Sequence, residues 1–306
     1  MRIFLNEHCD YGKGAAKWRE VEPRLKKAVG PFVVEPIESP YSLPDQVQRA
    51  VDAGEHFFFV AGGDGTVNLV VNALLSTNQS DVLFGAIGLG SSNDYFKPFT
   101  ERERINGIAC RIDAHHAQKV DLIKITFGLM PGHGKSRFCI NNSSVGITAD
   151  ANAIYNNKSI ILQNIQKMSL EGAILSSAVW SLYRHKPLLC SLSWDANKEQ
   201  LFRINNIGIL KNPHVAGAMK YNVDISSTDG LMAVFLCRDM TRVEILGTLF
   251  QLYRHQCPQH PKTRLFKTKR LVIQAQNPFA LECDGEVEKA MWASFEIMPQ
   301  ILRCCL

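Results

Sequence analysis

Two periodicities alternate along the first part of the chain. Short apolar runs rich in β-branched and aromatic residues, typical of buried strands, lie at residues 2–5, 32–34, 57–61 and 82–87. The segments between them space apolar residues three and four positions apart, which predicts helices over 15–29, 44–53 and 66–75. In the last of these, one helical face carries Val67, Val70, Val71, Leu74 and Leu75. Strands that alternate with helices in this way predict an α/β domain with a doubly wound, mostly parallel sheet.

The pattern changes near Lys119. From there the chain shows short alternating segments between polar turns, at residues 120–127, 136–140, 203–210, 231–237 and 270–275. Such alternation predicts antiparallel strands with one buried face. A helical region, residues 150–185, interrupts them, and its apolar face holds Leu170, Ala173, Ile174, Ala178, Val179 and Leu182. We therefore predict a second, β-rich domain, with the boundary close to Asp121.

The third predicted strand ends in a glycine turn that carries one carboxylate. Gly62, Gly63 and Gly65 bracket Asp64, and the predicted helix follows at once. Glycine backbone lets an anion approach closely, and the unpaired N–H groups of a helix start point toward it. Asp64 cannot hold a phosphate directly because like charges repel. It suits the orientation of a metal-bound water, or the acceptance of a proton from an attacking hydroxyl, so the turn indicates phosphoryl transfer.

A second glycine turn, Gly88 to Asp94, follows the next predicted strand and offers two serine hydroxyls, an amide and a carboxylate. In a parallel sheet ligands bind at the carboxyl ends of the strands, where both turns are expected to lie. Taken alone, the second turn is equally well explained as a helix cap, and Asn93 in place of a third glycine makes it a weak dinucleotide signature. Its pairing with the turn at Asp64 favours a ligand site.

The composition of the chain narrows the class of protein, its partners and its compartment. The 306 residues exceed one average domain, and 46% hydrophobic with 21% charged residues are ordinary for a globular protein. The net charge of +5 permits an anionic partner without requiring nucleic acid, and no nucleic-acid partner is expected. Nine cysteines without a Cys-x-x-Cys pair indicate free thiols in a reducing compartment. No apolar run approaches the ~18 residues of a spanning helix, so we expect a cytoplasmic protein that at most visits a membrane surface.

A signature and five further motifs resemble the diacylglycerol kinase catalytic-domain family. This family includes bacterial lipid kinases and sphingosine kinases, and is more distantly related to NAD kinases and phosphofructokinases. The signature is Gly62–Asn68. The further motifs, in chain order, are Gly90–Asp94, Val120–Leu122, Asn141–Asp150, Thr228–Leu231 and Cys283–Glu286. The resemblance covers nearly the whole chain.

The resemblance implies an N-terminal α/β nucleotide-binding domain, a C-terminal antiparallel β-sandwich, and ATP in the cleft between them. On this basis residues 1–121 form the nucleotide-binding domain, completed by the tail 289–306. Residues 122–288 form the lipid-binding or substrate-binding domain, with inserted helices.

The resemblance also implies roles for single residues. Glu286 is the implied general base that takes the proton from a lipid hydroxyl, with Asp64 as the runner-up. Asp121 would order a catalytic magnesium–water network, and Asp229 would hold a structural Mg²⁺. ATP would be bound by Gly62, Gly63, Gly65, Thr66, Asn68, Gly90, Ser91, Asn93 and Asp94. These roles fit phosphoryl transfer, in which positioning and charge neutralisation supply most of the catalysis.

Three departures from the family pattern concern nucleotide binding. Leu69 stands where glutamate is usual, Ser91 stands where threonine is usual, and the loop of residues 6–14 lacks an Asn-Pro start. They put nucleotide affinity in question more than reaction type, and they leave open a catalytically weakened relative.

Two segments bear on membrane contact. Residues 262–270 carry Lys262, Arg264, Lys267, Lys269 and Arg270 without an acid. Each such charge contributes about 1 kcal/mol beside an anionic membrane. The alternative is an edge strand protected by lysines. The apolar face of residues 170–182 is explained either by an acyl-chain cleft or, more simply, by a core helix.

We therefore expect an ATP- and Mg²⁺-dependent lipid kinase that acts on a hydroxyl such as that of diacylglycerol. A kinase for a soluble acceptor such as NAD is the first alternative. The turn at Gly90–Asp94, followed by Tyr95 and Phe96, and the basic segment favour the lipid acceptor. The second alternative is a nucleotide- or membrane-binding regulator without turnover. A homodimer is left open.

Overall fold

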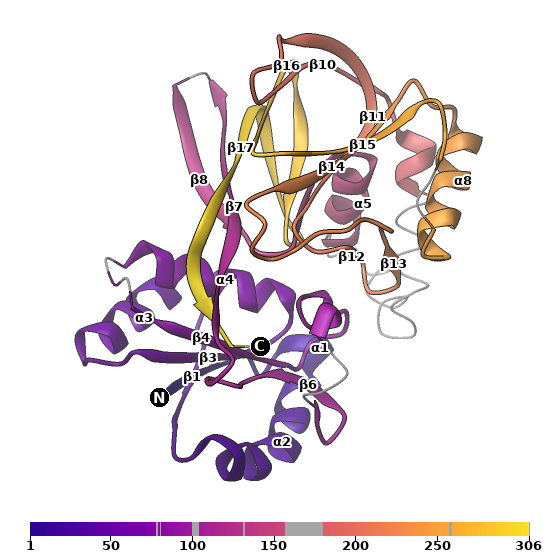
Figure 1. The fold of residues 1–306 in the computed structure, drawn as a ribbon. Helices are drawn as coiled ribbons and strands as arrows, with labels where there is room; N and C mark the ends of the chain where they lie inside the picture. The colour runs from indigo at the N-terminus through magenta and orange to yellow at the C-terminus, as the bar shows by residue number, and fades with distance from the viewer. Residues whose placement is uncertain are drawn as a thin grey trace. The chain divides into compact units, whose positions relative to one another are not determined.

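The computed structural model describes residues 1–77, 79, 81–99, 104–130, 132–156, 180–256 and 259–305. The chain divides into two compact units (Figure 1). The first comprises Met1–Val120 with Gln300–Leu306, and the second comprises Asp121–Pro299. The chain thus passes from one unit to the other twice. Residues 289–299 belong to the second unit in this division, and only the last residues join the first.

A parallel sheet forms the centre of the first unit. Its strands, in spatial order, are β4 (Leu83–Gly88), β3 (Phe57–Gly62), β1 (Arg2–Leu5) and β2 (Val33–Pro36). Two segments pair with the other edge of β4. They are the antiparallel β6 (Ile108–Arg111), which also pairs with β5 (Arg104–Ile105), and the parallel end of β17 (Glu286–Cys304).

Helices cover both faces of this sheet because successive strand residues point to opposite sides. On one face, Ile3, Phe59 and Ile87 pack against Trp18 and Val21 of α2 (Gly14–Val29). The other face holds α3 (Leu43–Asp52) and α4 (Asp64–Ser76), which contact each other. The short helices α1 (Cys9–Gly12) and η1 (Asp94–Phe99) follow β1 and β4. The predicted doubly wound, mostly parallel sheet is confirmed.

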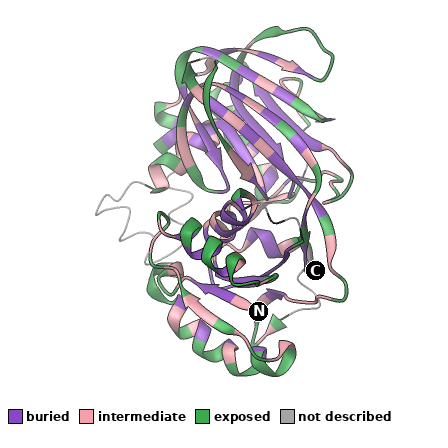
Figure 2. Cartoon of the chain, turned by 90° about the vertical axis from the view of Figure 1, so that its left-hand side faces the viewer, coloured by how far each residue is buried: buried purple, intermediate pink, exposed green. Residues whose placement is uncertain are grey.

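The second unit is an antiparallel β-sandwich, as predicted, around one apolar core. Figure 2 shows buried and exposed residues along its strands, and some strands, such as β14, are buried over nearly their whole length. The strands β9, β10, β11 and β16 close on one another, because β11 and β16 each pair with both β9 and β10. The strand bounds are β7 (Gln118–Met130), β8 (His133–Cys139), β9 (Asn142–Gly146), β10 (Leu188–Trp194), β11 (Gln200–Leu210), β14 (Met232–Arg238), β15 (Thr263–Thr268) and β16 (Arg270–Cys283). A small hairpin joins β12 (His214–Val215) to β13 (Met219–Lys220).

Two helices, α5 (Ile147–Asn156) and α8 (Arg242–Tyr253), complete the second unit. Of the predicted helical region, residues 150–156 belong to α5 and residues 180–184 are helical. The predicted apolar face lies outside the described residues except for Leu182, which is buried in the same apolar cluster as Phe235. No helix of the described residues is long and apolar enough to cross a bilayer.

Candidate functional site

The two glycine turns of the first unit touch backbone to backbone. Gly62 ends β3, and Gly63 adopts an extended conformation before α4 begins at Asp64. A Cβ added at Gly90 would lie 2.5 Å from the Cα of Gly63, closer than real Cβ atoms come to another atom. Only glycine at position 90 allows this approach. The structure therefore brings the two predicted phosphate turns together at the carboxyl ends of β3 and β4.

The start of α4 is open to an anion. No side chain caps the helix at Gly63, and a Cβ added at Gly65 would meet no atom within 4 Å. The first N–H groups of a helix lack intrahelical partners and carry the positive end of its dipole. The turn can therefore accept a phosphate through its backbone.

Asp64 links the two turns through its carboxylate. Its Oδ1 accepts a hydrogen bond from the N–H of Tyr95 at 2.8 Å, and its Oδ2 accepts one from the N–H of Asp94 at 3.1 Å. Asp64 thus caps η1 from the start of α4. These bonds fix the orientation of the carboxylate.

The other predicted residues of the second turn have distinct places. Asn93 holds a left-handed backbone (φ 50°), and its Nδ2 donates to the carbonyls of Gly88 and Gly90, both at 3.0 Å. Asp94 is buried and forms an ion pair with Lys97. Ser91 is exposed at the tip of the turn. Asn93 therefore shapes the turn, while the hydroxyl of Ser91 is accessible to a ligand.

Thr66 and Asn68, predicted as ATP ligands, are buried in α4. The Oγ1 of Thr66 accepts a hydrogen bond from Nδ2 of Asn6 at 2.9 Å, and the side chain of Asn68 accepts one from Asn72. These contacts hold α4 to the loop after β1 and to itself. The structure places both residues beside the turn rather than at its open surface.

Sequence reasoning missed Lys17, which fastens the second turn. Its ammonium group donates to the carbonyls of Leu89 and Gly90 at 3.0 and 3.1 Å, and pairs with Asp10 at 2.9 Å. Lys17 lies in the first turn of α2, where no local motif marks it. It joins the loop of residues 6–14, in which Asp10 is left-handed (φ 50°), to the glycine turns.

In the second unit the structure brings Asp121 and Asp229 together around Lys211. The ammonium nitrogen of Lys211 lies 2.9 Å from Oδ2 of Asp121, 2.8 Å from Oδ1 of Asp229 and 2.8 Å from the carbonyl of Leu231. Oδ2 of Asp121 also accepts the N–H of Gly230 at 2.7 Å. Burial by itself would raise the pKa of Asp229, but the hydrogen bond and charge of Lys211 outweigh it and hold that pKa below its ordinary value.

This cluster does not fit the structural Mg²⁺ that the resemblance implies for Asp229. The side chains of Lys211 and Asp121 are 2% and 0% exposed, so the cation that these oxygens surround is the ammonium group itself. A divalent ion at the same oxygens would displace a buried like charge. Asp229 therefore holds no metal ion in the function proposed for the chain, whereas the role of Asp121 in a magnesium–water network stays a prediction.

Glu286 follows a tight turn between β16 and β17. Asp284 and Gly285 both have positive φ (46° and 93°), as an Asp-Gly turn of type I′ requires. The carboxylate of Asp284 accepts N–H groups of Ile140, Asn141 and Asn142 at 2.7–2.9 Å. Burial raises the pKa of Asp284, and the backbone bonds oppose this shift. Glu286, by contrast, is exposed, as a general base must be before substrate arrives.

A second buried carboxylate, Glu282, supports the same turn and was not predicted. It accepts the N–H of Gly285 and the hydroxyl of Ser144, both at 2.7 Å. Burial raises the pKa of Glu282 from its ordinary 4.5 to about 7. The signal in the sequence was an acid two residues before Asp284 at an inward position of a strand.

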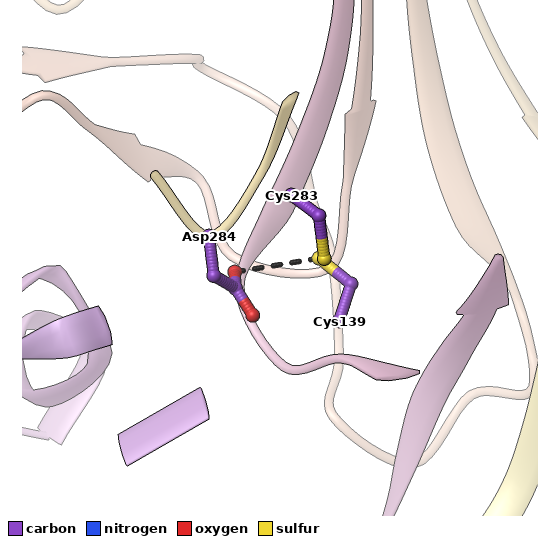
Figure 3. A group of neighbouring side chains, drawn as sticks. All are labelled: Cys139, Cys283 and Asp284. Carbon is purple, nitrogen blue, oxygen red and sulfur yellow. Dashed lines mark hydrogen bonds between the residues drawn. The ribbon is translucent and has the colours of Figure 1, made fainter. Parts of the chain in front are cut away.

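Cys139, Cys283 and Asp284 lie together in the core and could be mistaken for a metal site (Figure 3). The thiol of Cys139 donates to Oδ1 of Asp284 at 3.3 Å, and burial raises the pKa of Cys139 well above its ordinary value. A metal requires the thiolate form and free carboxylate lone pairs. Asp284 already accepts three backbone N–H groups and the Cys139 thiol, so hydrogen bonds within the protein account for this cluster.

Comparison with known proteins also divides the chain into an N-terminal and a C-terminal part. Residues 1–125 match the diacylglycerol kinase catalytic domain. Residues 142–306 match the YegS C-terminal NAD kinase beta sandwich-like domain. The chain belongs to the family that combines a diacylglycerol kinase catalytic domain with a YegS-type C-terminal domain.

Several family members are similar over most of their length. A protein of Xanthomonas axonopodis named probable lipid kinase YegS-like is 26% identical over 272 residues, which cover 84% of this chain and 81% of the relative. A diacylglycerol kinase of Staphylococcus epidermidis is 24% identical over 250 residues, 82% of this chain and 74% of the relative. A crystal structure of a diacylglycerol kinase from Bacillus anthracis superimposes with a TM-score of 0.69 at 13% identity and covers 99% of this chain and 95% of that one. This last likeness concerns the fold.

Proposed function

We propose that this family member is an ATP- and Mg²⁺-dependent lipid kinase, which transfers the γ-phosphate of ATP to a lipid hydroxyl such as that of diacylglycerol. The observation that carries the proposal is the contact between the two glycine turns, with Asp64 held at their junction. Relatives named lipid kinase and diacylglycerol kinase support a lipid as the acceptor.

The first unit has residues suited to binding a nucleoside triphosphate. The backbone N–H groups at Gly63 and Gly65 and the hydroxyl of Ser91 would hold its phosphates, and Asp64 would orient Mg²⁺ or a water bound to it. The nucleotide supplies the phosphoryl group, and the metal supplies positive charge beside the developing negative charge. Lys17 keeps the second turn in place by holding its carbonyls.

Glu286 is the proposed general base. Its exposed carboxylate follows a turn that Asp284, Glu282 and Asn156 hold in place through the backbone, so the carboxylate starts from a fixed position. In the proposed reaction it accepts the proton of the lipid hydroxyl as the hydroxyl oxygen bonds to the γ-phosphorus of ATP. The bond from that phosphorus to the β–γ bridging oxygen breaks, and ADP leaves. The action of Glu286 and Asp64 on one phosphate is part of the proposal and stays a prediction.

Tyr95, Phe96 and the basic segment of residues 262–270 have structural roles that do not require a lipid. Tyr95 and Phe96 are buried beside Phe84 and Arg111, so they stabilise the first unit. In the basic segment, β15 is an edge strand of the sheet, and Lys262 pairs with Glu244. That position fits an edge strand protected by lysines. Membrane contact through residues 262–270, and with it a peripheral cytoplasmic location, therefore stays a proposal.

The decisive experiment offers labelled ATP with Mg²⁺ to the purified protein together with mixed micelles of candidate lipids, and with NAD as a soluble acceptor. Label should enter a lipid. Label in NAD would replace the proposal by a soluble-acceptor kinase, and label in neither would favour the regulator. Asp64→Ala should abolish labelling with the fold intact, while Asp45→Ala, the same change in the first turn of α3, should leave it unchanged.

A further inference from the structure

Lys211 occupies the centre of a loop that otherwise has the chemistry of a divalent-cation site. Three oxygen atoms converge there, from two carboxylates and the carbonyl of Leu231. Carboxylates and carbonyls are the ligands that Mg²⁺ and Ca²⁺ take in proteins. The three distances of 2.8–2.9 Å are those of charge-assisted N–H···O bonds.

The ammonium group of Lys211 donates a hydrogen bond to each of these three oxygen atoms. Its three N–H donors match the three oxygen acceptors one to one, which leaves no donor of Lys211 without a partner. The remaining charge of Asp121 and Asp229 faces N–H groups of Gly230, Leu231 and Ser226 and, at 3.6 Å, Lys267. A divalent ion among the same oxygens would lie against a buried ammonium group, and their repulsion would expel one of the two.

We propose that Lys211 is a built-in replacement for a structural divalent cation, so that the loop of residues 226–231 and the second unit fold without metal. The lysine side chain extends from β11 into the loop and joins Asp121, at the start of the unit, to Asp229. Asp121 is therefore a structural anchor for this loop. The proposal does not depend on which acceptor the enzyme phosphorylates.

The full-length wild-type protein tests this without any substitution. Three of the four tryptophans, Trp180, Trp194 and Trp292, belong to the second unit, so thermal unfolding followed by tryptophan fluorescence reports mainly on it. Without nucleotide, the melting temperature should be the same in EDTA, Mg²⁺ and Ca²⁺. Amide exchange of residues 226–231 should likewise be unaffected by either ion.

Substitution at Lys211 should create the metal dependence that the wild type lacks. Lys211→Ala removes the charge and opens space, and should lower the melting temperature by roughly 10 °C in EDTA because two carboxylates lose a buried partner. Millimolar Mg²⁺ or Ca²⁺ should restore part of this loss. Lys198→Ala, at an exposed lysine of the second unit, is the control and should show neither effect.

Two results would overturn the proposal. One is a rise in the wild-type melting temperature with Mg²⁺ or Ca²⁺ that disappears in Asp229→Asn, since the ion would then bind at this loop. The other is a Lys211→Ala protein that melts like the wild type, or whose loss no divalent ion restores. None of these measurements uses ATP or lipid, so failure here is separate from failure of the lipid kinase proposal.

Discussion

Glu282 and Glu286 are two carboxylates on opposite sides of one turn, and their surroundings suit them to different tasks. Glu282 is 6% exposed and holds the N–H of Gly285, whereas Glu286 lies at the surface. A general base needs access to substrate, and a buried carboxylate with both oxygens engaged does not have it. Glu282 is therefore a positioning residue, and Glu286 is the candidate catalytic residue.

Glu286→Gln tests the catalytic half of this division. The amide keeps the shape of the side chain but cannot accept the proton of a hydroxyl, so turnover in the lipid assay should fall by about 100-fold or more. Glu288→Gln, on the same strand and paired with Lys135, is the control and should keep full activity. A loss under about tenfold in Glu286→Gln would be too small for a general base.

Glu282 predicts how stability depends on pH. Its folded pKa of about 7 lies above the ordinary 4.5, so between these values the folded protein keeps a proton that the unfolded chain has lost. The stabilising effect of that proton is complete below the unfolded pKa and is lost as pH rises through the folded one.

Glu282→Gln should remove this dependence, because the amide can still accept from Gly285 and hydrogen-bond to Ser144. As pH rises from acidic to alkaline, the unfolding free energy of the variant should increase relative to that of wild type. The increase should be about 3 kcal/mol at most. Urea unfolding at both pH values measures the gain. Glu288→Gln should show no such gain. Parallel pH profiles for wild type and Glu282→Gln would contradict the raised pKa.

At the scale of the elements, Gly90 in the turn after β4 and Gly65 at the start of α4 must be glycine for different reasons. At Gly90 the demand is steric, because a Cβ would collide with the backbone at Gly63. At Gly65 the space is open, so the demand there comes only from a ligand that approaches the backbone. The two positions can therefore be told apart by stability and activity measured together.

Gly90→Ala should lower the free energy of unfolding by about 1–3 kcal/mol, the range for overpacking, and should also lower activity. Gly65→Ala should raise the unfolding free energy by up to about 1 kcal/mol, since alanine favours helices, yet impair turnover through a higher KM for ATP. Gly247→Ala, in α8, is the control for the helix effect and should leave KM unchanged. An unchanged KM in Gly65→Ala would remove the backbone at this turn from the ATP site.

The helices and strands themselves could be predicted because burying one face of an element spaces its apolar residues at a regular interval along the sequence. The apolar alternation of residues 120–127 is a local pattern, and these residues lie in β7. The helical spacing after Gly65 is also local, and those residues form α4. The contacts that hold the candidate site are not local. Lys17 reaches the second turn across 72 residues, Lys211 reaches Asp121 across 90, and Glu282 reaches Ser144 across 138. No pattern within a window of the sequence carries such pairs, which is why these three residues were missed.

At the scale of the whole molecule, the chain returns to its starting unit. After β17 leaves the second unit, Arg303 and Cys304 pair with Leu83 and Phe84 of β4, and the N–H of Cys305 donates to the carbonyl of Phe84 at 2.7 Å. Leu302, Cys304 and Cys305 are at most 1% exposed. The first unit is thus completed by a segment that follows the whole second unit along the chain.

Truncation after Pro299 should therefore unfold the first unit selectively. Loss of three buried side chains costs roughly 5 kcal/mol, which is comparable to the stability of a small domain. Hydrogen exchange should show lost protection in β1, β3 and β4, with protection kept in β10, β11 and β14. Leu302→Ala, which removes one of the three side chains, should weaken the first unit only partly. If exchange in the truncated protein matched wild type, or rose equally in both sets of strands, the tail would not be the element that completes the first unit.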